Sequence, residues 1–440
     1  MNSVEVVREA LLQRHRHFSS RPPLFTLNVL GVRKSSIAFG DYCPVQVQRK
    51  RCALRAIHEI VFSNVEHFNK IVQEVFLEFK AELVKRGSKN FQPSIQLKMV
   101  VIKIMFNFTF GEDSGNHHLS EELQKLAVES IEFTESSAAG ALVDFVPWLK
   151  PLVRKQIAIV EHSVEDLINF VHKVYTTRKG YLSNESCIAL CLAKLLKKKN
   201  MKLSKEMKTE FELGEQMDLS QSPPKGKSDN TGDEGMVKMI SADIFGAGLE
   251  TVSNALCWAM AYIVNNPKTQ QDLHEELDSA VGRHRLPTIQ DKPNMPLLQA
   301  TVLEVLRISS VLPIALPHQT SEDTTLGEYK IPRDSLVVVN LWAVNHDPRT
   351  FENPHEFNPY RFLDENGDVC EKKTKFQLPF SIGSRRCLGS TLAKAELFLL
   401  LACLLQNFEF SSATGRNVDL EGRFGLTLSP KPFSICANLR

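Results

Sequence analysis

The sequence predicts a mainly α-helical fold with small β-sheets, in a single domain that spans residues 1–440. Segments with apolar side chains at helical spacing follow one another up to Ser309. Short strand-like segments and a stretch rich in proline and asparagine, residues 347–360, come after it. Hydrophobic residues make up 43% of the chain and charged residues 24%, which is ordinary for a folded globular body.

The expected helices are separated by proline, glycine or runs of polar residues. The segment 65–86, for example, places Val72, Phe76, Phe79 and Leu83 on one face. We expect helices at residues 4–13, 46–64, 65–86, 95–110, 119–134, 155–177, 186–199, 236–265, 269–281 and 296–309.

One long segment between two expected helices is polar. The second half of residues 206–235 contains no large apolar side chain apart from its prolines. Expected helices with the same apolar spacing flank this segment on both sides. We therefore predict a disordered surface loop within the domain rather than a domain boundary.

The strand signals are short and lie late in the chain. We expect an extended segment at 311–317 and a hairpin whose strands, 326–331 and 335–341, flank a turn at 332–334. Further short strands are expected at 422–426 and 432–437.

The overall composition excludes several classes of protein. A formal net charge of +2 argues against nucleic acid as the main partner. Nine cysteines without paired spacing indicate free thiols in a reducing compartment. The sequence shows neither a signal peptide nor a run of about twenty apolar residues, so we expect no membrane span in this chain.

The segment from Phe380 to Gly389 contains one cysteine, Cys387, in a loop with Arg385 and Arg386. An apolar helix is expected to follow directly. Cationic neighbours and a helix N-terminus lower a thiol pKa, and the glycines let backbone approach whatever the sulfur holds. The loop therefore indicates a thiolate ligand, with a buried structural cysteine as the alternative.

A second unusual segment lies inside the expected helix at 236–265. Gly246 and Gly248 each cost about 1 kcal/mol relative to alanine within a helix. Ala247, Gly248 and Thr251 share one face of small side chains, and the Thr251 hydroxyl can bond to the carbonyl of Ala247. The face predicts either a groove beside the helix or a close crossing with another helix.

These segments and two further motifs resemble the cytochrome P-450 superfamily of heme-thiolate monooxygenases, in the same order and spacing. The four motifs are the cysteine loop, Ala247-Gly248-Leu249-Glu250-Thr251, Glu304-Val305-Leu306-Arg307 and Pro359-Tyr360-Arg361-Phe362. The residue patterns of this chain are similar to those of the microsomal steroid 17-alpha-hydroxylase and aryl-hydrocarbon hydroxylase groups. The resemblance implies the cytochrome P-450 fold, with the N-terminal anchor, the first helix and part of the first sheet missing.

The resemblance also implies heme b as the cofactor, with Cys387 as the axial ligand of its iron. The residues Phe380, Gly383, Arg385, Gly389, His318 and Lys50 would contact the heme. Gln46 and Lys50 replace a tryptophan and an arginine of the family pattern, so heme affinity is expected to be weaker. Glu304 and Arg307 alone suggest a surface ion pair, but the resemblance makes Glu304, Arg307 and Arg361 a buried network beneath the cysteine loop.

The implied activity inserts one oxygen atom of O2 into a C–H bond of an apolar molecule, a steroid or a polycyclic aromatic xenobiotic. Thr251 and Glu250 would carry protons. Electrons would come from NADPH through a flavoprotein reductase, with a cytochrome b-type protein as a further donor, at the cytoplasmic face of the endoplasmic reticulum membrane. The substrate pocket would be lined by Phe245, Ala247, Val311, Ile314, Leu316, Phe424 and Leu426.

A basic surface near the cysteine would receive the electron donor. We expect it to include Lys372, Lys373, Lys375 and Arg386, together with Arg49 and Arg51. The alternatives are a heme-thiolate isomerase or dehydratase that acts on a peroxide, and a non-catalytic heme-binding remnant.

Overall fold

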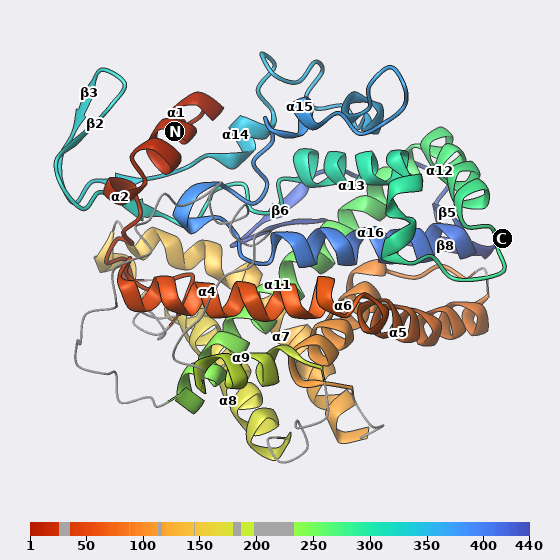
Figure 1. Ribbon diagram of the computed structural model, residues 1–440, viewed down its shortest axis with the longest axis horizontal. Coiled ribbons are helices and arrows are strands. Elements are labelled where there is room, and N and C mark those ends of the chain that lie inside the picture. Colours follow the sequence, from red (N-terminus) through yellow and green to blue (C-terminus); the bar gives the residue numbers. More distant parts are fainter. Residues whose placement is uncertain (26–35, 88, 113–116, 145, 179–185, 198–232) are drawn as a thin grey trace.

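The computed structural model describes residues 1–25, 36–87, 89–112, 117–144, 146–178, 186–197 and 233–440 (Figure 1). Helices dominate this part of the chain, and its strands form two-stranded sheets. The predicted mainly α-helical fold with small sheets is therefore confirmed. Most of the loop predicted at 206–235 lies outside the described residues, and its last three positions already belong to a helix.

The long helices follow the predicted periodic segments closely. Proline occupies the first turn of several of them, where its missing N–H is not needed. They are α4 (Pro44–His58), α5 (Val65–Arg86), α6 (Pro93–Phe110), α7 (His117–Ala141), α8 (Arg154–Arg178), α9 (Ile188–Lys197), α11 (Asp233–Asn265), α12 (Pro267–Ala280), α13 (Pro296–Ser309) and α16 (Ser390–Asn407).

Short helical segments fill the connections between these helices. The α-helical ones are α1 (Val4–Arg8), α2 (His15–Phe18), α14 (Leu341–Asn345) and α15 (Glu371–Thr374). Two π-helical segments, η1 (Glu9–Gln13) and η2 (Glu59–Ser63), extend α1 and α4. The 3-10 segments are η3 (Leu142–Asp144), η4 (Pro147–Leu149), η6 (Ile289–Asn294), η7 (Pro359–Phe362) and η8 (Gly383–Arg385).

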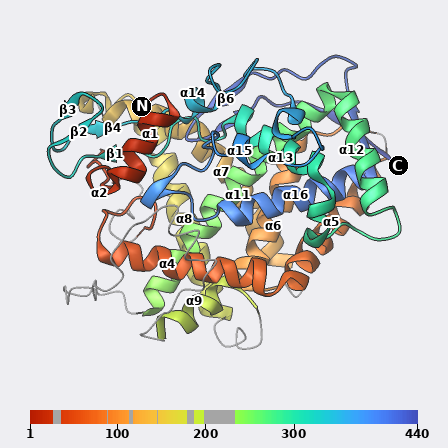
Figure 2. The same ribbon diagram turned by 45° about the horizontal axis from the view of Figure 1, so that its top comes forward.

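The longest helix, α11, runs through the middle of the molecule (Figures 1 and 2). It packs against α6, α8 and α9 on one side and against α13 and α16 on the other. Phe245, Leu256, Trp258 and Ile263 of α11 are almost completely buried in the main hydrophobic core. The second half of α16 is buried around its circumference, which explains why its sequence is apolar at nearly every position.

The sheets are small and antiparallel. β1 (His318–Gln319) pairs with β4 (Leu336–Val337), β2 (Thr324–Leu326) with β3 (Tyr329–Ile331), β5 (Phe408–Ser412) with β8 (Ile435–Leu439), and β6 (Gly422–Phe424) with β7 (Leu428–Pro430).

The predicted hairpin around 332–334 is wrong. The hairpin turns at residues 327–328, where Leu326 pairs with Tyr329, and Leu336 pairs instead with Gln319. Gly327 adopts φ 56°, which a tight turn needs and glycine adopts without steric cost. Pro332 lacks the N–H that a strand ladder uses, and it follows β3 directly.

The first twenty residues pack onto the β-rich part of the molecule. Val7, Leu11 and Phe18 form a second apolar cluster with Val339 and Leu378. The N-terminal ammonium of Met1 donates to the carbonyl of Val338 at 2.8 Å. Along the described part of the chain, no helix has both the length and the apolar character needed to cross a membrane.

Candidate active site

The cysteine loop is held in place by its own backbone and by the N-terminal segment. The N–H of Cys387 donates to the carbonyl of Phe380 at 3.0 Å. Gly383 adopts φ 77°, and a Cβ there would lie 2.0 Å from the carbonyl oxygen of Leu11. Glycine at this position is therefore required by both the backbone conformation and the close approach of η1.

Cys387 is exposed, although Ser384 and Ser390 on either side of it are buried. The protein around the sulfur nevertheless excludes much of the water that would solvate a thiolate, and this desolvation raises the pKa of Cys387. The Gly389 backbone, Arg386 and Lys50 act in the opposite direction. The sequence predicted a lowered pKa, but desolvation outweighs the nearby charges here. A bound metal cation would therefore be needed to hold the thiolate.

The segment of α11 from Gly246 to Thr251 combines two close helix crossings with an exposed alanine. A Cβ at Gly246 would lie 2.7 Å from Leu167 of α8, and one at Gly248 would lie 2.5 Å from Met105 of α6. Close helix crossings therefore account for both glycines. Ala247, between them, is exposed in the middle of this largely buried helix. The Thr251 hydroxyl donates to the carbonyl of Ala247 at 2.8 Å, the bond that the sequence predicted.

Several cations gather behind the cysteine loop. Arg385 donates to the carbonyls of Ser19, Ile37 and Gly40 at 2.7–3.2 Å, and Lys50 donates to the carbonyl of Ser384. His318 is buried, and its Nδ1 lies 2.7 Å from the carbonyl oxygen of Phe18. Burial, with the charges of Arg21 and Arg385 nearby, lowers the pKa of His318 to about 3, so the ring is neutral.

Arg21 belongs to this cationic group, although it was not predicted from the sequence. Its guanidinium is buried and donates to the carbonyls of Ala38, Leu316 and Pro317 at 2.7–3.0 Å. Burial and the charge of Arg385 lower the pKa of Arg21. An arginine before two prolines, in a segment without other charges, was the signal that could have identified it.

Gln46, which stands where the family pattern has a tryptophan, does not supply the hydrogen-bond donor of that tryptophan to this group. The residue is buried, and its amide nitrogen donates to the carbonyl of Ile37 at 2.9 Å. Its amide oxygen is buried without a hydrogen-bond partner among the described residues. An amide oxygen accepts hydrogen bonds, so it adds no donor for an anion.

Glu250 is engaged by groups that the sequence analysis did not predict. Its Oε2 lies 2.5 Å from Nζ of Lys98 on α6, and its Oε1 accepts from Asn254 Nδ2 at 2.9 Å. Asn254 also donates to Thr427 Oγ1 at 3.0 Å. The acid that was expected to act with Thr251 is thus part of a buried network that joins α6, α11 and the connection between β6 and β7.

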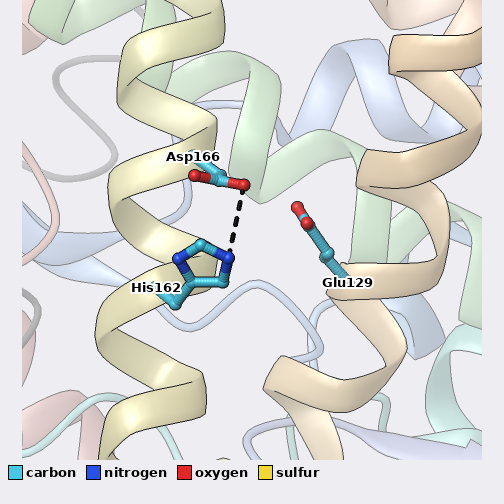
Figure 3. A group of neighbouring side chains, drawn as sticks. All are labelled: Glu129, His162 and Asp166. Carbon is cyan, nitrogen blue, oxygen red and sulfur yellow. Dashed lines mark ion pairs between the residues drawn. The ribbon is translucent and has the colours of Figure 1, made fainter.

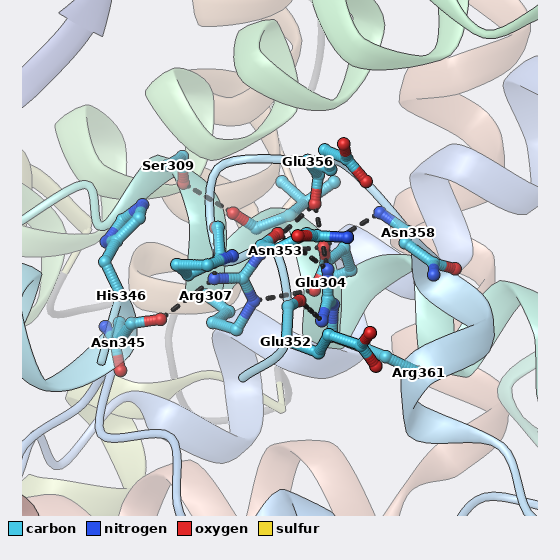
Figure 4. A network of polar contacts seen from close by, with 12 residues as sticks. Glu304, Arg307, Ser309, Asn345, His346, Glu352, Asn353, Glu356, Asn358 and Arg361 are labelled. Carbon is cyan, nitrogen blue, oxygen red and sulfur yellow. Dashed lines mark hydrogen bonds and ion pairs between the residues drawn. The ribbon is translucent and has the colours of Figure 1, made fainter. Parts of the chain in front are cut away.

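Glu304, Arg307 and Arg361 come together in a second network (Figure 4). Arg307 binds both carboxylate oxygens of Glu304 at 2.8 Å, and both side chains are fully buried. Arg361 lies 3.2 Å from Glu304 Oε1. This burial excludes the surface ion pair that the i, i+3 spacing alone suggested.

Asn345 joins this network to the cysteine loop. Arg307 donates to the carbonyl of Asn345 at 2.9 Å, and Asn345 Oδ1 accepts from the N–H of Leu378 at 2.8 Å. Leu378 lies two residues before Phe380, at the start of the cysteine loop. The network therefore supports that loop through backbone contacts.

The apolar residues expected to line a substrate pocket have different surroundings. Phe245 is fully buried, with its ring 5.9 Å from those of Phe110 and Phe170. Ile314 and Phe424, in contrast, are 42% and 57% exposed. The others range from buried to exposed: Val311 is buried, Leu316 and Leu426 are half-buried, and Ala247 is exposed.

The expected basic surface is present only in part. Lys372, Lys373 and Lys375 on and after α15 are exposed, and Arg386 is half-buried. Arg49 was expected on the same surface, and this expectation is wrong. It is only 4% exposed because α4 turns this side chain inward.

A further polar group lies between α7 and α8, where Glu129, His162 and Asp166 bring ligand-type atoms within 4.8 Å of one another (Figure 3). Lys125 Nζ lies 2.6 Å from Asp166 and 3.2 Å from Glu129. The hydrogen bond from Lys125 lowers the pKa of Asp166. The group is therefore an ion-pair cluster in which a lysine already supplies the cation.

The residues around Cys387 fit a heme group. An accessible, desolvated thiol suits a metal such as iron, and buried cations suit the carboxylates of a porphyrin. Gly389 lies beside the sulfur, where an added Cβ would make an ordinary contact 4.0 Å from Sγ. Cys387 would hold the iron, and the charged Arg21, Lys50 and Arg385 would meet the carboxylates. The neutral ring of His318 uses its one N–H on the carbonyl of Phe18 and has none left for a carboxylate.

Comparison with known proteins agrees with this chemistry. Residues 1–437 match the family model described as Cytochrome P450. Cytochrome P450 2U1 of Homo sapiens is 33% identical over 437 residues, which cover 99% of this chain and 75% of that protein. Steroid 17-alpha-hydroxylase/17,20 lyase of Squalus acanthias is 31% identical, with 100% of this chain and 82% of that protein covered.

Two further comparisons support the same assignment. Cytochrome P450 1A2 of Cavia porcellus is 33% identical over 98% of this chain and 80% of its own length. A solved zebra fish cytochrome P450, described as another structure with progesterone, superposes with a TM-score of 0.82 at 28% identity. The superposition covers 100% of this chain and 93% of that one.

Proposed function

The chain belongs to the cytochrome P450 family of heme-thiolate monooxygenases, and on that premise we propose that its substrate is an apolar molecule of the steroid class. One oxygen atom of O2 is inserted into a C–H bond of this substrate. Heme b, when bound, supplies the chemistry that activates O2. The remaining steps, which bind and orient the substrate and bring protons, belong to residues of this chain.

The observation that carries the proposal is that one chain contains both an exposed cysteine in its loop and an exposed alanine within the largely buried α11. Cys387 offers a thiol that would hold the heme iron, and Ala247 is an exposed position in the middle of α11. Thr251 lies one turn further along α11, with its hydroxyl on the carbonyl of Ala247. A hydroxyl held in this way can order a water molecule and pass a proton in a poorly hydrated site.

Support for the substrate class comes from the apolar residues expected to line the pocket and from the relatives. Val311, Ile314, Leu316, Phe424 and Leu426 offer apolar surface without charge, which suits a rigid hydrocarbon skeleton. The names of two similar proteins refer to a steroid hydroxylase and to progesterone. A polycyclic aromatic substrate is the second candidate, favoured by the similarity to cytochrome P450 1A2.

The same proposal includes a partner and a location. An NADPH-dependent flavoprotein reductase, assisted by a cytochrome b-type donor, docks on the exposed Lys372, Lys373 and Lys375. The relatives suggest the cytoplasmic face of the endoplasmic reticulum membrane.

The first test is the spectrum of the reduced carbon monoxide complex of the full chain. A thiolate-type spectrum is expected, and Cys387→Ser should abolish it because serine is not a soft ligand. Cys43→Ser, at an exposed cysteine, serves as the matched control and should leave the spectrum unchanged. A thiolate-type spectrum that survives Cys387→Ser would show that another residue holds the iron.

The second test concerns coupling. Thr251→Ala should consume NADPH with less product formed, because ordered proton supply is lost; a change on the order of tenfold or more is expected. Ser253→Ala is the control, since Ser253 makes a similar bond to the carbonyl of Leu249 while fully buried. Unchanged coupling in Thr251→Ala would exclude a role for Thr251 in proton transfer.

The third test separates the substrate classes. Progesterone and pyrene are titrated into the heme-loaded chain, and binding is followed by the optical shift of the heme. Tighter binding of progesterone is expected, while tighter binding of pyrene would favour the aromatic alternative.

A further inference from the structure

The turn from Ser36 to Gly40, which precedes α4, is stabilised by bonds within itself. Ser36 Oγ accepts from the N–H groups of Ala38 and Phe39 at 3.1 and 3.3 Å. The N–H of Gly40 donates to the carbonyl of Ser36 at 3.0 Å. Ser36, Ile37 and Gly40 are buried. These five residues form a compact unit, the anchored segment.

The backbone of Ile37 is held from two helices. Its N–H donates to Asp243 of α11 at 2.6 Å, and Asp243 also accepts from the hydroxyl of Ser36 at 2.9 Å. The Ile37 carbonyl accepts from Gln46 of α4 at 2.9 Å. Gln46 is buried, so this hydrogen bond is stronger than it would be in water. The anchored segment is thus tied to both α4 and α11.

Two cations hold the same segment from the side of the cysteine loop. Arg385 donates to the carbonyls of Ile37 and Gly40 at 3.2 and 2.7 Å. Arg21 donates to a further carbonyl of the segment at 3.0 Å. The Ile37 carbonyl therefore accepts from both Gln46 and Arg385, which the two lone pairs of a carbonyl oxygen allow.

These carbonyls orient the guanidinium of Arg385. A guanidinium is planar and carries its N–H donors in a rigid fork, so bonds on one edge determine where the other donors point. Arg385 is one of the charged residues that would meet the heme carboxylates, and a bond between arginine and a carboxylate depends on this geometry. A displaced Ile37 carbonyl would turn the fork and weaken its bond to a carboxylate.

Gln46 and Asp243 act on this arrangement from opposite sides. Gln46 shares one acceptor, the Ile37 carbonyl, with Arg385. Asp243 holds the N–H of the same residue and lies on α11, about one turn before the exposed Ala247. The anchored segment therefore connects the cations behind the cysteine loop to the part of α11 that is expected to face the substrate.

We propose that Gln46 and Asp243 are positioning residues for the heme carboxylates. Each holds a backbone group of Ile37, Ile37 orients Arg385, and Arg385 binds a carboxylate. Because such coupling is reciprocal, a carboxylate on Arg385 also holds the anchored segment against α11. This inference rests on the heme that the proposed function requires.

The test compares heme with heme dimethyl ester, whose carboxylates are esterified and uncharged, in the full chain. The variants are Gln46→Leu and Asp243→Asn. Gln73→Leu is the control, because Gln73 of α5 makes a similar bond to the carbonyl of Pro287 at 2.8 Å. The rate at which each porphyrin passes to excess apomyoglobin measures how firmly the chain holds it. Hydrogen exchange of the Ile37 amide reports on the anchored segment.

Heme should leave both variants about fivefold faster or more than it leaves the unsubstituted chain. Loss of the ester should change by about twofold or less, because the ester lacks the charge that Arg385 binds. Gln73→Leu should change neither rate. In the unsubstituted chain, the Ile37 amide should exchange about fivefold more slowly with heme than with the ester.

Faster loss of heme and ester alike would overturn the proposal, since Gln46 and Asp243 would then support the fold without acting on the carboxylates. Unchanged loss of heme in both variants would also overturn it. If the variants do not fold, the unsubstituted chain decides, because equal Ile37 exchange with heme and ester would exclude the coupling. A chain that takes up neither porphyrin would refute the proposed function as well, so the two failures are distinguishable.

Discussion

Two fully buried glutamates on neighbouring helices have opposite surroundings. Glu304 of α13 accepts from Arg307, from Arg361 and from the backbone N–H of Asn358. Glu396 of α16 has no hydrogen-bond partner for either carboxylate oxygen among the described residues, and burial raises its pKa to about 8. A buried carboxyl can therefore anchor two arginines, as Glu304 does, whereas burial without a cation nearby holds Glu396 as a neutral acid up to about pH 8.

The first prediction concerns Glu304, the glutamate that is paired with arginines. Glu304→Ala leaves Arg307 as a buried unpaired cation, which should cost about 3–5 kcal/mol of folding free energy. Because the network supports the cysteine loop through Asn345 and Leu378, stable heme incorporation should also be lost. Heme content and the midpoint of urea unfolding are the measurements.

The control for Glu304→Ala is Glu275→Ala, at an exposed position of α12. It should change stability by no more than about 0.5 kcal/mol. A soluble Glu304→Ala protein with full heme content would contradict the supporting role of the network.

The second prediction removes the unpaired acid. The pKa of Glu396 in the folded protein, about 8, lies above its ordinary value of 4.5. Its stabilising effect is thus complete below pH 4.5 and is lost as the pH rises toward 8. Glu396→Gln should remove this pH dependence, which amounts to about 3 kcal/mol between pH 5 and pH 8.

Thermal unfolding of Glu396→Gln is compared with that of the unsubstituted chain at both pH values. The variant should gain stability relative to the unsubstituted chain mainly at pH 8. Glu275→Gln again serves as the exposed control. Equal pH dependence in the two proteins would mean that Glu396 finds a partner in solution.

The third prediction concerns Asp243, a carboxyl that has hydrogen-bond donors, unlike Glu396, but no ion pair like that of Glu304. Asp243 of α11 accepts from neutral donors, the N–H of Ile37 at 2.6 Å and the hydroxyl of Ser36 at 2.9 Å. Burial raises its pKa from 3.8 to about 6, and the stability that the protonated form contributes is lost over that interval as the pH rises.

Asp243→Asn should loosen the segment beginning at residue 36 by about 1 kcal/mol, because the amide cannot accept both hydrogen bonds. Faster hydrogen exchange of the Ile37 amide is the measurement. Ser36→Ala removes one donor to Asp243 and also the acceptor of the Ala38 and Phe39 N–H groups, so it should loosen the same segment. Exchange as slow as in the unsubstituted chain would show that Asp243 does not hold this segment.

Much of the candidate site was predictable because its signals are local. The loop around Cys387, the Ala247–Thr251 bond and the i, i+3 spacing of Glu304 and Arg307 each lie within one segment. The strands with which β3 and β4 pair were not predictable to the same degree, because β3 pairs with β2 and β4 with β1. A hairpin at 332–334 and one at 327–328 both contain turn-forming residues, and only the neighbouring β1 selects between them.

The sequence by itself determined the helical framework, the loop that carries Cys387 and the bond from Thr251 to Ala247 on α11, since periodicity and short spacings specify them. The tertiary structure alone decided that Lys98 meets Glu250, that Arg21 joins the cations behind the cysteine loop, and that Glu396 has no partner. Residues 98 and 250 are 152 positions apart, and no local pattern relates them. Charges and burial act through space, so the protonation of these groups depends on which helices pack together.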